Sequence, residues 1–219
     1  MPIDLSRWPQ PSDVEDVLNA AGLWPTSIAA QTAAAVEIGI AIPSAVANFE
    51  RKTGWVPFLS GAADETRLFD ATDERGLLHL EAGIVAVTSV LVAGESYVPN
   101  VNCWLRQSNA PAHKYPYDQI QFPQGISAVH PGMYPNQIAV TGRWGYCAVL
   151  PADVWDAVRQ GAAAMTALRL TPISEGVIRT NTEDNARQSY DLGLRRPDRI
   201  SEWFNQYNNA ANHYERVVV

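Results

Sequence analysis

Hydrophobic periodicity changes twice along this chain, and the two changes limit what it can fold into. Apolar residues recur at helical spacing up to residue 54, in short extended runs from 55 to 150, and again at helical spacing after 150. Helical segments on both sides of a β-rich one indicate an insertion. We therefore predict an α+β fold, in which a helical bundle domain carries a large inserted antiparallel β-sandwich or barrel-like domain and an extended C-terminal arm ending in a helix.

The predicted domain boundaries follow these changes of pattern. The 219 residues suffice for one domain with a large insertion. Residues 1–54 and 151–172 are expected to form the two parts of the helical domain. Residues 55–150 form the inserted β domain, and residues 173–219 form the arm.

The first helical part contains two predicted helices. Ser12 and Glu15 form a Ser-x-x-Glu capping box that starts the first helix, and Gly22 suits its end. The second helix is Ala-rich, is expected to bend or split at Pro43, and stops at Gly54. Its predicted inner stripe consists of Ile28, Ala35, Ile38 and Ile42.

Six short runs with β-branched residues, separated by turn residues, predict the strands of the inserted domain. They span residues 66–70, 77–80, 84–92, 101–105, 119–122 and 138–141. Residues 109–135 are poor in pattern and predict a long loop.

The C-terminal part begins with a helix that starts at Pro151. Its predicted apolar stripe consists of Val154, Val158, Ala162, Met165 and Leu168. A polar stretch comes next, and Pro197 opens a last helix with an apolar, mainly aromatic face. That face contains Ile200, Phe204, Tyr207, Ala211 and Tyr214. A polar connector followed by such a helix is typical of an arm that docks on a partner.

Charge and composition exclude several classes of function. Sixteen Lys and Arg against 23 Asp and Glu give a net charge of −7, which argues against a protein that grips nucleic acid. No signal peptide is evident, and no apolar run approaches the ~20 residues of a membrane span, so no membrane partner is expected. Cys103 and Cys147 are interpreted as unbridged thiols in a reducing compartment.

No pattern indicates a catalytic, cofactor or metal site. The sequence lacks a Gly-x-Ser-x-Gly elbow and paired histidine ligands, so we predict neither enzyme activity nor a cofactor. Gly142 and Gly145 are interpreted as residues of a tight turn between strands. Carboxylates at Asp64, Glu65, Asp73 and Glu74 are interpreted as solvated turn charges.

Aromatic residues leave two interpretations open. Tryptophans such as Trp55, Trp104 and Trp144, with tyrosines such as Tyr117 and Tyr146, either line a sugar-binding face or fill the core and build subunit contacts. No cluster of polar partners accompanies them at fixed spacing, which favours core and interface.

One block of sequence resembles a known family. Residues 138–146 read IAVTGRWGY, and residues 150–158 read LPADVWDAV and lead into a small-residue helix. This strand-turn-helix block, marked by Gly142, Trp144, Gly145, Pro151 and Trp155, is similar to that of the head–tail connector (neck adaptor, or head completion) proteins of tailed bacteriophages. The order of the helices and strands from residue 26 onward resembles that family as well.

The resemblance implies a structural virion protein of the neck, assembled in the host cytoplasm as a ring of twelve copies. Such a ring binds the portal protein, extends the DNA channel with DNA only as passing cargo, and offers a surface to the next neck or tail protein, of the terminator, stopper or nozzle type. Family members hold the portal largely through their C-terminal segment. The residues implied here are Ile178, Tyr190, Ile200, Trp203, Phe204, Tyr207, Tyr214, Val217 and Val219.

Two alternatives from other classes stay open at the sequence level. One is a carbohydrate- or receptor-binding module that uses the β domain and its Tyr-rich loop. The other is a hydrolase that uses scattered carboxylates.

Overall fold

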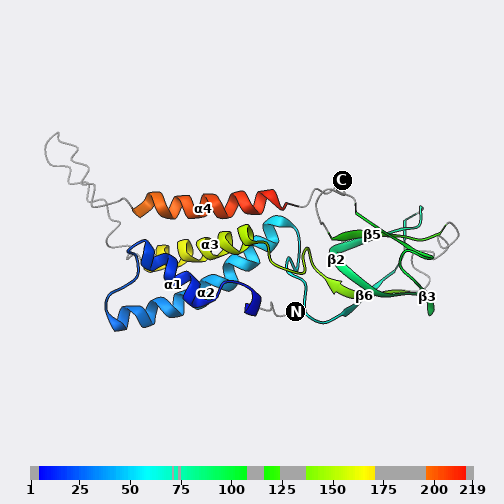
Figure 1. Ribbon diagram of the computed structural model, residues 1–219, viewed down its shortest axis with the longest axis horizontal. Coiled ribbons are helices and arrows are strands. Elements are labelled where there is room, and N and C mark those ends of the chain that lie inside the picture. The colour runs from blue at the N-terminus through cyan, green and yellow to red at the C-terminus, as the bar shows by residue number, and fades with distance from the viewer. Residues whose placement is uncertain are drawn as a thin grey trace. The chain divides into compact units, whose positions relative to one another are not determined.

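The computed structural model describes residues 5–70, 72–73, 75–107, 116–123, 137–170 and 196–215 (Figure 1). A 3-10 turn, η1 (Leu5–Arg7), precedes the helices α1 (Pro11–Ala20), α2 (Ile28–Thr53), α3 (Ala152–Leu170) and α4 (Arg196–His213). The strands are β1 (Glu65–Phe69), β2 (Leu77–Val92), β3 (Glu95–Tyr97), β4 (Trp104–Arg106), β5 (Tyr117–Gln121) and β6 (Ile138–Trp144). The predicted α+β class is confirmed.

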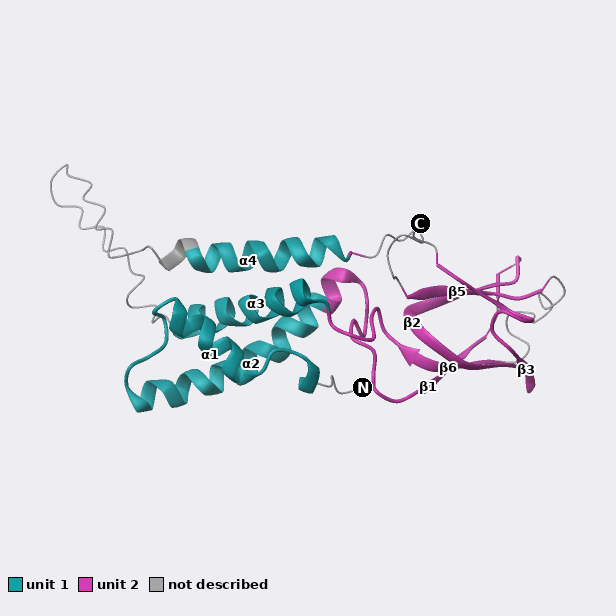
Figure 2. Ribbon diagram, in the orientation of Figure 1, with its two compact units in different colours: residues 1–49, 151–214 teal, residues 50–150, 215–219 magenta. Residues whose placement is uncertain are grey.

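The chain divides into two compact units (Figure 2). A helical unit is drawn from residues 1–49 and 151–214, and a β unit is drawn from residues 50–150 and 215–219. The boundary falls inside α2, so the last turn of this helix, from Glu50 onward, belongs to the β unit.

The start of α1 differs from the predicted capping box. Gln10 is the N-cap, and its backbone N–H donates to a carboxylate oxygen of Asp13 at 2.6 Å. Pro11 takes the first helical position, where its missing N–H costs nothing, and this shifts the predicted cap at Ser12 into the helix. The predicted end is confirmed: Gly22 has a φ of +67°, and the N–H of Leu23 donates to the carbonyl of Leu18 at 2.8 Å.

Helix α2 runs without interruption through Pro43, so the predicted split is wrong. Its buried face consists of Ala34, Ile38, Ala41, Ile42, Ala45, Val46 and Phe49. The predicted inner stripe is correct at Ile38 and Ile42 but wrong at Ile28 and Ala35, which are exposed. The cause is that residues all around this helix are apolar or small, so periodicity marks the buried side poorly.

By length and composition alone, α2 could cross a membrane, contrary to the expectation from the sequence. An 18-residue window reaches a mean hydropathy of 1.4, and 39% of that window is buried within the protein.

The described residues of the β unit form a six-stranded antiparallel sheet in the order β1-β6-β2-β5-β4, with β3 also pairing to β2. The two strands predicted over 77–80 and 84–92 are one strand, β2, whose register shifts between His79 and Ile84. Its first half pairs with β5 and its second half with β6. The hydrophobic core of the sheet contains Leu80, Ile84, Val90, Ile120, Phe122, Ile138 and Val140.

Candidate docking surface

Helix α4, the helix predicted to carry partner contacts, packs in the helical unit through Tyr207. This side chain is 2% exposed, and its hydroxyl donates to the carbonyl oxygen of Ala45 in α2 at 2.7 Å. Its ring meets Phe49 edge to face, with 6.0 Å between centroids. Gly161 of α3 makes room for the ring, because a Cβ there would lie 2.6 Å from a ring carbon. Tyr207 therefore joins α4 to both α2 and α3.

The other predicted docking residues of α4 are less buried. Ile200, Trp203 and Phe204 are half-buried in the first part of the helix. Tyr214, at its end, is also half-buried, and its hydroxyl donates to the carboxylate of Asp153, whose oxygens lie 3.0 and 3.1 Å away. Ile178, Tyr190, Val217 and Val219 lie outside the described residues.

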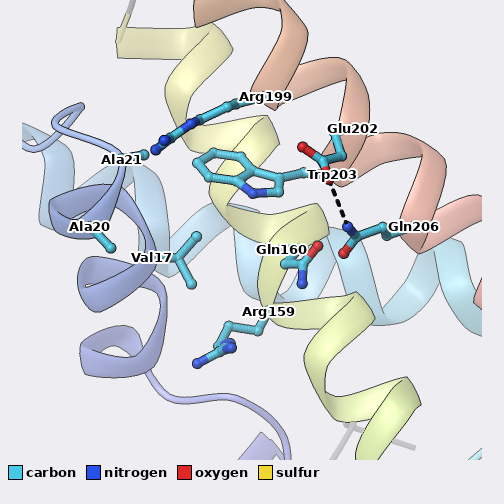
Figure 3. Close-up of a pocket in the computed structure, with 9 residues that line it drawn as sticks. All are labelled: Val17, Ala20, Ala21, Arg159, Gln160, Arg199, Glu202, Trp203 and Gln206. Atoms are coloured by element: carbon cyan, nitrogen blue, oxygen red, sulfur yellow. Dashed lines mark hydrogen bonds between the residues drawn. The ribbon is translucent and has the colours of Figure 1, made fainter.

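A surface groove of about 400 Å³ lies between α1, α3 and α4 (Figure 3). In this view the indole of Trp203 lies between Arg199 of α4 and Val17 of α1, and Ala21, the residue after α1, also lines the groove. Its other lining residues are Ala20, Arg159, Gln160, Glu202 and Gln206. The groove thus combines one aromatic surface with several hydrogen-bonding side chains.

Two polar atoms in this region have hydrogen-bonding capacity to spare. A terminal nitrogen of Arg159 lies 2.8 Å from the carboxylate of Asp156, and the guanidinium lies 4.9 Å above the ring centre of Trp155. Among the described residues, the buried Arg159 Nε and Gln160 Oε1 have no hydrogen-bond partner. Both atoms are buried, so a docked chain can bond to them only if these side chains move.

The strand-turn-helix block plays a structural role at each of its residues. Trp144 is buried, and its indole N–H donates to the carbonyl of Glu65 at 2.8 Å. Gly142 lies within β6, where a Cβ would overlap the carbonyl oxygen of Ala86 on β2, so its predicted turn role is wrong. Gly145 has a φ of +146°, and a Cβ there would lie 2.7 Å from backbone atoms of Ser60. These glycines let the backbone pack closely.

In the helical unit, the same block starts α3. Pro151 directly precedes the helix, and its carbonyl accepts a hydrogen bond of 2.9 Å from the N–H of Trp155. The Trp155 ring is half-buried under the Arg159 guanidinium.

Of the carboxylates that the sequence brought forward, Asp64, Glu65 and Asp73 have structural contacts, and Glu74 lies outside the described residues. Asp64 accepts a hydrogen bond from Thr88, and Glu65 lies within β1. Asp73 accepts the backbone N–H groups of Leu77 and Arg75, and these bonds lower the pKa of this carboxyl. Cys103 is buried, the thiol of Cys147 donates to the carbonyl oxygen of Phe58 at 3.7 Å, and the described residues contain no cluster of three or more potential metal ligands.

The aromatic residues for which a sugar-binding role stayed possible lie mainly in the core. Trp55, Trp144 and Tyr146 are buried, and Tyr146 stacks on Phe58 at 4.7 Å between centroids. Trp104 is 44% exposed on β4. The interpretation as core residues is confirmed for the buried three.

Comparisons with known proteins give one fold match. No family model and no curated protein matches the chain. Among solved structures, it resembles a chain in the neck of an empty gene transfer agent (GTA) particle, computed with C6 symmetry. The identity is 16%, the TM-score is 0.51, and the match covers 100% of this chain and 94% of the other. This chain therefore shares its α+β fold, over its whole length, with a protein of a phage-like neck.

Proposed function

We propose that this protein is a structural component of the neck of a phage-like particle, where a ring of its copies joins the portal to the tail. The observation that carries the proposal is the fold match over the entire chain with a neck protein of a GTA particle. A match that includes both the helical unit and the inserted sheet is more specific than a match to a helical bundle alone. No catalytic step is part of this role.

The sequence supports the same role independently. The strand-turn-helix block around Trp144 and Pro151 resembles the head–tail connector family, for which a ring of twelve copies is expected. A net charge of −7 suits a channel wall, because an acidic surface offers few cations to the phosphates of passing DNA.

Within this proposal, the first part of α4 and the groove beside it form the portal-docking surface. Tryptophan and arginine are enriched among the residues that dominate binding energy at interfaces. Trp203 and Arg199 supply both types at one groove. Tyr207, in contrast, anchors α4 to its own unit, so we propose that it supports docking only by holding the helix in place.

Light scattering of the purified chain, alone and mixed with the portal ring of the same particle, tests both parts of the proposal. Full-length protein should form a ring-sized complex on the portal, and a chain truncated before Pro197 should not. Trp203→Ala should weaken portal binding by roughly tenfold or more, as loss of a central aromatic contact does.

Trp104→Ala is the matched control, since it makes the same substitution at an exposed tryptophan of the β unit. If both variants bind the portal equally well, α4 is not part of the docking surface. Absence of any complex between the full-length chain and the portal would refute the adaptor role itself.

A further inference from the structure

The outer face of α2 is uncharged and exposed over several turns. Between residues 28 and 49 the helix has one charged residue, Glu37, and its carboxylate pairs with Arg169 of α3 at 3.1 Å. Ile28, Val36 and Ile40 are 83%, 60% and 46% exposed. Large side chains exposed in one row are unusual for a surface that meets only water.

These residues form a ridge of the kind by which helices pack. Ile28, Thr32, Val36 and Ile40 follow one another at intervals of four residues, which places them in one row along the helix. Gly39 lies beside Ile40, and nothing lies within 4 Å of the position that its Cβ would occupy. A ridge with an open gap beside it can interdigitate with a second helix. We call these five residues the α2 outer face.

Physical chemistry favours a protein over a membrane as the partner of this face. A helix that lies on a membrane carries Lys and Arg on its polar side, whereas the basic residues of α2 are confined to its last turn at Arg51 and Lys52. The opposite side of α2 is already occupied, because the Ala45 carbonyl accepts the Tyr207 hydroxyl and Phe49 packs on the same ring. The helix is therefore not surrounded by lipid.

We propose that the α2 outer face is where one copy of this chain meets the next, an inference that rests on the proposed ring. Each copy carries a net charge of −7, so adjacent copies repel one another wherever their acidic surfaces approach. A contact through an uncharged face avoids that repulsion and removes exposed apolar surface from water. In a closed ring, such a face packs against a different patch of the neighbouring copy.

The test is the assembly of full-length Val36→Glu/Ile40→Glu protein, followed by light scattering alone and on the portal ring. Both positions are exposed, so the circular dichroism spectrum and melting temperature should match those of the unchanged protein. Assembly should weaken by more than about a hundredfold, because two carboxylates then enter an apolar contact between acidic copies.

Val98→Glu/Val101→Glu is the matched control, because it adds the same charges at valines of the β unit that are 51% and 71% exposed. This pair should assemble normally. Normal assembly of the α2 pair, or equal loss in both pairs, would overturn the inference while leaving the ring in place.

Two further outcomes separate the inference from the proposed function. If the unchanged protein forms no assembly alone or on the portal, the ring fails and the α2 contact fails with it. If the unchanged protein floats with liposomes of phosphatidylcholine and phosphatidylglycerol and the α2 pair does not, the face binds lipid and the copy-to-copy contact is wrong.

Discussion

Two glycines inside helices differ in what an added methyl group would meet. At Gly161 of α3, a Cβ would lie 2.6 Å from the ring of Tyr207, whereas at Gly39 of α2 it would meet nothing within 4 Å. We expect Gly161→Ala to destabilise the helical unit by about 1 to 3 kcal/mol, because α4 must move away from α3.

Gly39→Ala is the control for this prediction and should be neutral or stabilising by up to ~1 kcal/mol, since alanine favours a helix. Urea denaturation of the two variants measures both values. Equal stability of the two would show that α4 adjusts freely.

The buried carboxylate of Glu50 should make stability depend on pH. Burial raises the pKa of Glu50 above its usual 4.5, although the N–H of Phe58, which donates to this carboxylate at 2.9 Å, opposes that shift. The folded state therefore binds the proton more tightly, and the stability from this group, complete below pH 4.5, is lost as pH rises through the raised pKa.

Glu50→Gln should remove this pH dependence and keep an acceptor for the Phe58 N–H. Denaturation curves measured from about pH 4 to pH 8 should therefore flatten in the variant. Glu50→Ala removes the acceptor and should cost about 1 to 3 kcal/mol. An unchanged pH profile in the glutamine variant would mean that Glu50 is not the titrating group.

Single residues were the hardest level to predict from the sequence. The Ser-x-x-Glu pattern at Ser12 is sound chemistry, yet Pro11 at the first helical position left Gln10 to cap the helix. Gly142 was assigned to a turn because local sequence does not reveal that β2 approaches β6 at this point. The two errors differ in origin: the cap is decided by Pro11, which the sequence shows, whereas the role of Gly142 is decided by a strand that is distant in sequence.

Among the helices, α4 is attached unevenly along its length. The Tyr207 hydroxyl is buried and bonded to a backbone carbonyl, while the Tyr214 hydroxyl makes its bond at the surface. Tyr207→Phe should cost about 1 kcal/mol, because the Ala45 carbonyl loses its buried donor, and Tyr214→Phe should cost less.

Denaturant unfolding of the two phenylalanine variants distinguishes these values. If Tyr214→Phe proves the more costly, the surface bond to Asp153 is the stronger attachment of α4 and the buried one contributes little.

At the level of elements, the predictions succeeded where periodicity is regular. The helices at residues 11–20, 152–170 and 196–213 and most strands were placed within a few residues. The predicted apolar stripe of α3 is correct at Val154, Val158 and Ala162, but Leu168 at its end is exposed. The interruption predicted between residues 80 and 84 is wrong, because β2 continues through Glu81, Ala82 and Gly83 and its register shifts between His79 and Ile84.

For the whole molecule, the alternation between helical and extended patterns was enough to predict the α+β class. The candidate site was harder to predict from the sequence, because the groove brings together Val17, Arg159 and Trp203 from three helices that are distant in sequence. The aromatic face of α4 was visible in the sequence, but the burial of Tyr207 against its own unit was not.

Self-association of the protein should depend on salt concentration, and the direction of that dependence tests whether the contact between copies is uncharged. Copies of charge −7 repel, and the screening length falls from ~10 Å at 0.1 M salt to ~3 Å at 1 M. Sedimentation velocity should therefore show tighter self-association as sodium chloride increases. Weaker association at high salt would indicate an interface that depends on ion pairs.

The position of the unit boundary within α2 has a consequence for cooperativity. The carboxylate that accepts the Phe58 N–H of the β unit sits on the last turn of a helix whose earlier turns belong to the helical unit. One turn of helix is not stable by itself, since isolated helices need about 12 to 15 residues. When the helical unit melts, that turn should fray, so the two hydrophobic cores are expected to unfold in one calorimetric transition.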